Sequence, residues 1–146
     1  MWETREIKIG AVILPSRLFL APMAGISNMA FRLAAKEHGA GLVCTEMISA
    51  EGIVRDNPRT LDLIAVSPEE RPIAIQLFGK STDVIARAAQ KVEAIADIID
   101  LNFGCPAKNV VKNGSGAALL KQPKLLGDIA CNVAKSVSCP VTAKIR

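Results

Sequence analysis

A cysteine three residues after an asparagine gives this sequence its clearest means of doing chemistry. Asn102 ends a largely apolar run that begins at Ile98, and Cys105 follows between a glycine and Pro106. The run predicts a strand buried on both faces, and the proline restricts the backbone of the cysteine. In parallel α/β folds, loops at the carboxyl ends of strands hold ligands and catalytic groups. A thiol on such a loop can act as a proton donor or a nucleophile.

Other polar side chains occupy similar positions along the chain. Gln76 stands among apolar residues of the run 72–77, and Lys144 stands among apolar residues of the final segment. A lysine in such a strand is costly to bury without an anionic partner. The partner is either a ligand that carries negative charge or an inward carboxylate, Asp100 or Glu46.

Strands and helices alternate along the chain, and this order decides where those side chains meet. Apolar runs predict five strands at 18–21, 41–45, 72–77, 98–102 and 140–146, after a short hairpin at 7–9 and 11–14. Capping residues and helical periodicity predict helices at 28–38, 82–96 and 123–137, and a mixed helical stretch at 49–65 with a break at Asn57.

This alternation demands parallel strands joined by right-handed crossovers. It leaves open both a doubly wound sheet and a (β/α)8 barrel. No G-x-G-x-x-G follows the first strand, which disfavours a dinucleotide-binding sheet. Polar residues at the ends of several consecutive strands are typical of a barrel. We therefore expect an α/β fold, a partial (β/α)8 TIM barrel of about five parallel strands preceded by a short N-terminal β-hairpin.

Length and composition indicate which broad class of protein this is. The chain has 146 residues, 50% of them hydrophobic, which is enough for one domain with a core. No apolar run approaches the roughly 20 residues that span a bilayer, and the polar start at 1–6 does not fit a secretory signal. We therefore expect a cytoplasmic protein without membrane contact. The net charge of +4 suits a polyanion such as nucleic acid, whereas the scarcity of aromatic residues argues against a base-stacking module.

The four cysteines form no C-x-x-C pair and have no interleaved histidines, so we expect no metal site. Cys44 and Cys131 are predicted to be small core residues. Cys139 lies at the wrong end of its predicted strand for catalysis.

Six segments in order, covering nearly the whole chain after residue 14, closely resemble the tRNA-dihydrouridine synthase family. They are Leu20-Ala-Pro-Met-Ala-Gly25, Cys44-Thr-Glu-Met-Ile-Ser49, Gln76-Leu-Phe-Gly79, Asn102-Phe-Gly-Cys-Pro106, Gly114-Ser-Gly-Ala-Ala-Leu-Leu120 and Lys144-Ile-Arg146. The resemblance implies the FMN-binding TIM-barrel domain of an oxidoreductase. It implies reduction of uridine in tRNA to 5,6-dihydrouridine, with NADPH reducing the FMN.

The resemblance also implies roles for particular residues. Cys105 would be the general acid that protonates C5 of the uracil, and Asn102 would contact the substrate. Gln76 and Lys144 would bind the flavin, the first at its polar edge and the second near N1–C2=O.

Each of these roles has a simpler alternative. The Asn102 amide could merely hold the loop backbone. The turn Pro22-Met23-Ala24, which the resemblance sets against the flavin, could be an ordinary strand-to-helix turn. Basic residues that either touch RNA phosphates or form a solvated face are Arg32, Arg55, Arg59, Lys108 and Lys112.

The chain ends at the fifth predicted strand, whereas a (β/α)8 domain takes about 250 residues. The family's later active-site histidine, its flavin-phosphate loops and its helical tRNA-binding domain have no counterpart here. We therefore expect residues 1–146 to be the N-terminal part of the barrel, inactive alone unless it self-associates or pairs with a missing half. Two other functions stay open: another FMN barrel oxidoreductase such as a dihydroorotate dehydrogenase-like enzyme, and a non-catalytic half-barrel that binds flavin or RNA.

Overall fold

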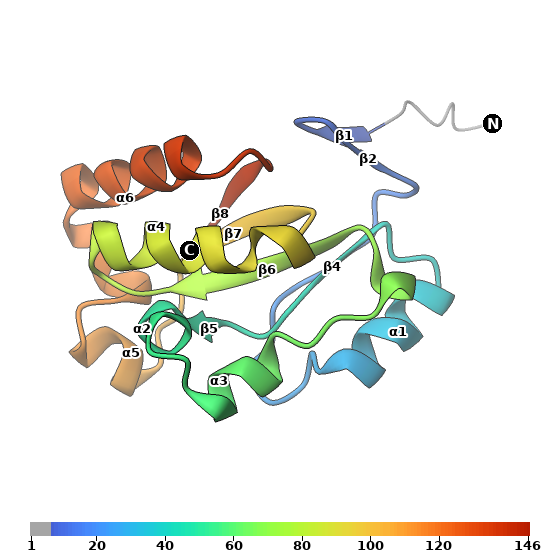
Figure 1. Ribbon diagram of the computed structural model, residues 1–146, viewed down its shortest axis with the longest axis horizontal. Helices are drawn as coiled ribbons and strands as arrows, with labels where there is room; N and C mark the ends of the chain where they lie inside the picture. Colours follow the sequence, from blue (N-terminus) through green and yellow to red (C-terminus); the bar gives the residue numbers. More distant parts are fainter. Residues whose placement is uncertain (1–6) are drawn as a thin grey trace.

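A curled sheet of parallel strands forms the centre of the computed structural model, which describes residues 7–146 (Figure 1). The strand order is β3-β4-β6-β7-β8, so neighbours in the sheet follow the order of the chain. Their bounds are β3 Phe19–Leu20, β4 Leu42–Cys44, β6 Ile73–Phe78, β7 Ile98–Phe103 and β8 Val141–Ile145. A doubly wound sheet would reverse its order at a switch point. The prediction of a partial TIM barrel is therefore confirmed.

A short strand that the sequence analysis did not predict extends this sheet. β5, Ile48–Ser49, pairs in parallel with the carboxyl end of β6. Its second residue begins the stretch 49–65 that was predicted to be helical, and the rest of that stretch contains two separate helices, α2 (Ala50–Val54) and α3 (Pro58–Leu63). The break before α3 falls at Asn57, as predicted, because its side chain caps the new helix.

Helices cover one face of the sheet. α1 spans Met29–Glu37, α4 Thr82–Val92, α5 Lys108–Lys112 and α6 Pro123–Ser136, with short 3₁₀ helices at Pro68–Glu70 (η1), Glu93–Ile95 (η2) and Gly116–Lys121 (η3). Asn28 and Ser81 cap α1 and α4 through their side chains. α2, α4 and α6 pack side by side, and their apolar faces share one core with β6 and β7. The glycine-rich turn after β7 holds α5 and η3, which are too short for a periodic signal.

The period of two along a strand separates the apolar core from the polar residues. Ile99, Leu101 and Phe103 of β7 pack against the helices. Asp100 and Asn102 alternate with them and so point to the concave face of the sheet. The parallel register sets Gln76 beside Asp100, Asp100 beside Thr142, and Asn102 beside Lys144. The concave face therefore collects the polar side chains of three adjacent strands.

The hairpin packs against the amino-terminal end of this concave face. β1 (Ile7–Ile9) and β2 (Val12–Leu14) pair antiparallel, as predicted, through a turn in which Gly10 has a φ of +57°. Apolar residues of the hairpin contact Leu42, Cys44, Ala74 and Ile98. Polar chemistry is thereby confined to the opposite, carboxyl-terminal end.

The exposure of the cysteines agrees only in part with the prediction. Cys44 is buried, and burial raises the pKa of its thiol. Cys131 is exposed, so its assignment to the core was wrong: it lies on α6 but outside the stripe formed by Ile129 and Val133. Cys139 is half-buried, and burial also raises its pKa. No helix within residues 7–146 is long and apolar enough to cross a membrane.

Candidate functional site

A cavity of about 210 Å³ opens at the carboxyl ends of the parallel strands. Loops after β3, β4 and β7 and the ends of β6 and β8 line it, through Pro22, Ala24, Met47, Gln76, Asn102, Gly104, Cys105, Pro106, Lys144 and Arg146. The fold thus brings together every site residue predicted from the sequence except Met23. Met47 and Arg146 were not predicted, since neither residue type signals a site by itself.

Met23 holds the turn that forms one wall of the cavity. Its backbone N–H donates to the hydroxyl of Ser27 at 2.9 Å, and its carbonyl accepts from the backbone N–H of Ser27 at 2.9 Å. The N–H of Gly25, whose φ of +74° favours glycine, donates to Oε2 of Glu46 at 2.5 Å. The wall is therefore fixed from inside the turn and from the loop after β4.

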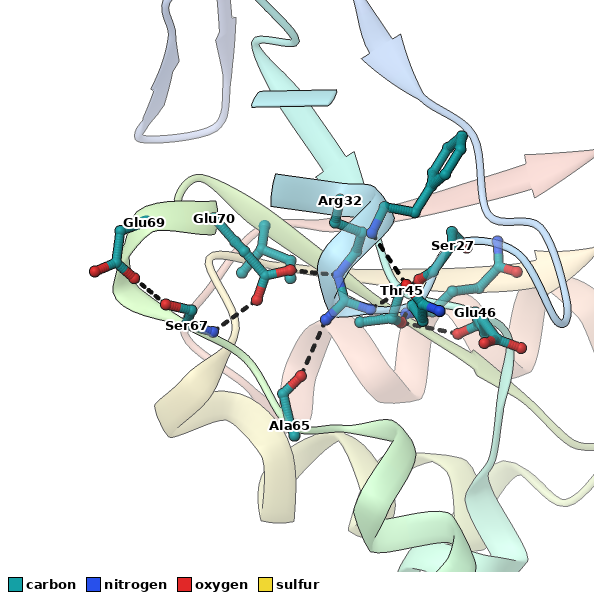
Figure 2. A network of polar contacts seen from close by, with 12 residues as sticks. Ser27, Arg32, Thr45, Glu46, Ala65, Ser67, Glu69 and Glu70 are labelled. Carbon is teal, nitrogen blue, oxygen red and sulfur yellow. Dashed lines mark hydrogen bonds and ion pairs between the residues drawn. The ribbon is translucent and has the colours of Figure 1, made fainter. Parts of the chain in front are cut away.

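Arg32 anchors the same turn from behind (Figure 2). Its Nη1 donates to the carbonyl of Ser27 at 2.8 Å, its Nη2 to the carbonyl of Ala65 at 3.0 Å, and its Nε to Glu70 at 2.5 Å. The side chain is only 2% exposed. The suggestion that Arg32 touches RNA phosphates at a rim was therefore wrong, because a carboxylate 38 residues further along the chain draws it inward.

The side-chain amide of Asn102 forms its hydrogen bonds with other groups of the protein. Its Oδ1 accepts from the backbone N–H groups of Gly104 at 3.1 Å and Cys105 at 2.9 Å. Its Nδ2 donates to Oε1 of Gln76 at 2.9 Å and lies 3.5 Å from the sulfur of Met47. These contacts agree with the simpler alternative, an amide that holds the loop backbone.

The loop that carries Cys105 packs tightly against η3. The carbonyl of Cys105 accepts from the N–H of Ala117 at 3.0 Å. Gly116 has a φ of +60°, and a Cβ built on it would lie 2.7 Å from that carbonyl oxygen. The Cys105 side chain itself stays half-buried at the cavity. A thiol held in this way is accessible from the cavity but cannot move far from it.

Lys144 lies opposite Asn102 on β8, which is the edge strand of the sheet. Its side chain is exposed. Among residues 7–146 it forms no ion pair with Asp100 or Glu46: the Asp100 carboxylate binds Gln76 and Thr142 instead. The predicted alternative of an inward ion pair is therefore wrong, and the ammonium is available to a ligand.

The remaining basic candidates lie on the surface. Arg55 reaches Glu51 on α2 at 3.4 Å, and both side chains are largely exposed. Arg59, Lys108 and Lys112 are exposed on α3 and α5. These positions fit either a phosphate-binding rim or a solvated face.

The chemistry of the lining suits a planar ligand with a polar edge. Pro22, Ala24 and Met47 offer apolar surface, whereas Gln76 and Lys144 offer an amide and a cation. Within the described part of the chain, no three histidine, cysteine or carboxylate side chains gather closely enough to hold a metal ion. The arrangement can hold an aromatic ring system beside a thiol that is able to donate a proton.

Comparison with known proteins finds sequence similarity along nearly the whole chain. A model of the family described as dihydrouridine synthase matches residues 19–146. A protein of Rickettsia conorii named probable tRNA-dihydrouridine synthase is 42% identical over 142 residues, covering 96% of this chain and 43% of the relative. The tRNA-dihydrouridine synthase B of Pasteurella multocida is 44% identical over 141 residues, covering 96% of this chain and 42% of the relative. The chain therefore spans less than half the length of these relatives.

Proposed function

Because this chain belongs to the dihydrouridine synthase family, we propose that the protein reduces uridine in tRNA to 5,6-dihydrouridine in the cytoplasm. FMN is the cofactor and NADPH is the reductant. The observation that carries this proposal is the shared cavity: the Cys105 thiol opens into the same space as Gln76 and Lys144. That combination supports a cofactor site with a proton donor beside it.

The lining residues fit a flavin. Pro22 and Ala24 would form an apolar wall for the isoalloxazine ring, held by the turn around Met23. Gln76 would bind the polar edge of the ring, and the exposed ammonium of Lys144 would stabilise negative charge near N1–C2=O. When bound, FMN supplies the hydride for C6 of the uracil.

Cys105 then supplies the proton. The loop holds the thiol at the cavity, and the S–H bond breaks as C5 of the uracil takes its proton. The substrate contact proposed for Asn102 uses the N–H group that otherwise points to the sulfur of Met47, since its oxygen binds the loop and its other N–H group binds Gln76. Its main task is to keep the loop backbone in place.

We propose that residues 1–146 are the N-terminal part of the catalytic barrel. The edge strands β3 and β8 then pair with further strands, either of a missing half or of a second copy. Phe19 and Ile145 on these edges are 50% and 60% exposed, which supports such pairing.

The test is an NADPH-dependent assay on unmodified tRNA with added FMN, in which dihydrouridine is measured by nucleoside mass spectrometry. Three proteins are compared: the chain, Cys105→Ala, and Cys131→Ala as the matched control on the exposed face of α6. We expect product to fall about 100-fold or more in Cys105→Ala, the usual contribution of a general acid, and to stay unchanged in the control.

Full activity of Cys105→Ala would refute the role of the thiol. Orotate formed from dihydroorotate, without dihydrouridine, would favour the other flavin barrel enzymes. Product from none of the three proteins would contradict catalysis by residues 1–146 alone. The same comparison would then be made in a protein with the length of the relatives.

A further inference from the structure

A buried carboxylate lies next to the site without a role in the steps above. Asp100 stands in the middle of β7, and its side chain is 8% exposed. Its Oδ2 accepts from Nε2 of Gln76 at 2.6 Å, and its Oδ1 accepts from the hydroxyl of Thr142 at 2.7 Å. Both oxygens therefore bind neighbouring strands, one on each side.

The carboxylate decides how the next two amides point. A carboxylate has only acceptor atoms, so Gln76 must turn its NH₂ group toward Asp100. Its Oε1 then faces Asn102 and accepts from Nδ2 at 2.9 Å. This contact turns Oδ1 of Asn102 toward the loop, where it accepts from the N–H of Cys105 at 2.9 Å. Each amide has a donor end and an acceptor end. The orientation that Asp100 imposes on Gln76 therefore also favours one orientation of Asn102 in this series of hydrogen bonds from Asp100 to Cys105.

The opposite direction would disrupt the loop. If the Asn102 amide turned over, its NH₂ group would face the N–H groups of Gly104 and Cys105, and donors would meet donors. Gln76 is 1% exposed and Asn102 is 8% exposed, so water cannot readily replace a lost partner. The loop geometry therefore depends on an amide orientation that Asp100, through Gln76, favours together with the N–H groups of the loop.

We propose that Asp100 is a positioning residue that orients the amides of Gln76 and Asn102 and thereby fixes the backbone of the Cys105 loop. It acts through those residues and touches no reacting atom. The inference rests on the proposed function only in that the loop carries the thiol assigned as proton donor.

The cysteines of the chain supply the measurement. The native chain is alkylated with iodoacetamide, and the rate at each cysteine is followed by peptide mass spectrometry. Cys131 is exposed and calibrates the reagent, Cys44 is buried and reports global unfolding, and half-buried Cys105 reports the loop. The experiment needs no tRNA, FMN or NADPH, so its failure is distinct from failure of the proposed function.

Two variants and a rescue test the direction of the series. Asp100→Asn keeps the shape but lets position 100 donate, so Gln76 loses its set orientation. We expect Cys105 to react about fivefold to tenfold faster relative to Cys131, the change that corresponds to one net hydrogen bond. Thr142→Val removes the other hydrogen bond to Asp100 without changing the direction, and we expect less than a twofold change, well below that of Asp100→Asn.

The rescue moves the carboxylate one step along the series. In Asp100→Asn with Gln76→Glu, the new carboxylate accepts from the amide at position 100 and from Nδ2 of Asn102, which restores the orientation of Asn102. We expect Cys105 reactivity to return to within about twofold of the original chain. A rescue of this kind distinguishes an effect on the orientation of the amides from a general loss of stability.

Unchanged Cys105 reactivity in Asp100→Asn would overturn the inference, and so would a double variant that reacts as fast as the single one. If Asp100→Asn also exposes Cys44, the single variant has unfolded, and the double variant decides. Protection of both Cys44 and Cys105 in the double variant supports the inference, and exposure of both overturns it.

Discussion

Removal of the Glu70 carboxylate should destabilise the fold more than any surface substitution. Glu70 is 0% exposed and accepts from Nε of Arg32 at 2.5 Å and from the N–H of Ser67 at 2.6 Å. Glu70→Ala leaves the guanidinium buried with two carbonyl partners and no counter-charge. Loss of one partner of a buried ion pair costs about 3–5 kcal/mol.

The chain contains a matched control for this change. Glu51 pairs with Arg55 at 3.4 Å, but these side chains are 52% and 78% exposed. Glu51→Ala should cost at most about 0.5 kcal/mol, because water screens the pair. The two substitutions remove the same kind of ion pair and differ mainly in burial.

Urea unfolding followed by circular dichroism measures the difference. With a dependence of about 2 kcal/mol per molar urea, Glu70→Ala should lower the midpoint by about 1.5–2.5 M, or abolish folding. Glu51→Ala should lower it by less than about 0.3 M. Arg32→Met with Glu70→Leu should recover most of the loss, since apolar residues of similar volume avoid the desolvation of both charges.

Equal midpoints for Glu70→Ala and Glu51→Ala would refute this reasoning. So would a double variant that is no more stable than Glu70→Ala. In either case the buried pair would not be what holds α1, η1 and the turn before α1 together.

Three further predictions concern the Cys105 loop, the ammonium of Lys36 and the carboxylate of Glu93. Gly116→Ala should cost about 1–2 kcal/mol in urea unfolding and lower dihydrouridine formation, because a Cβ at φ +60° meets the Cys105 carbonyl. Burial lowers the pKa of Lys36, whose Nζ has no hydrogen-bond partner. The unfolded chain therefore binds the proton more tightly, and stability rises as the pH approaches 10.5. Lys36→Met should raise the melting temperature at neutral pH and flatten that rise. The N–H of Ser138 lowers the pKa of Glu93, so its stabilisation is present above pH 4.5 and lost below it, and Glu93→Gln should remove that acid-induced loss in a pH series of melting temperatures.

Each of these has a clear contrary result. An unchanged midpoint in Gly116→Ala would show that the loop relaxes around a methyl group. A lower melting temperature in Lys36→Met would show that the ammonium is stabilised rather than strained. An unaltered acid profile in Glu93→Gln would exclude its contacts after α6 as a source of stability.

Local patterns identified most elements because each carries its own signal. The Ser81 cap and the apolar stripe of α4 depend on residues within a few turns of one another. The apolar runs of β6 and β7 likewise predict buried strands from a few consecutive residues. α5, η3 and β5 gave no such signal, because one or two helical turns show no clear period and the two residues of β5 form no apolar run.

The candidate site was predictable where a strand end and a motif coincided. Cys105, Asn102 and Gln76 follow or end apolar runs, and the parallel topology brings such ends to one edge. The burial of Arg32 could not be predicted in this way. Its sequence neighbours resemble those of any surface arginine, and its partner lies far along the chain.

The sequence by itself therefore determined the alternation of strands and helices, the family, and which residues end the strands. The alternation and the strand ends follow from apolar runs and capping residues over short stretches, whereas the family follows from the resemblance of six short segments. The tertiary structure alone decided which polar groups pair: Arg32 with Glu70, and Asp100 with Gln76 and Thr142. Hydrogen bonds and ion pairs require atoms within about 3 Å. Only the packing of α1 against η1 and the parallel register of β6, β7 and β8 bring residues so far apart in the chain to that distance.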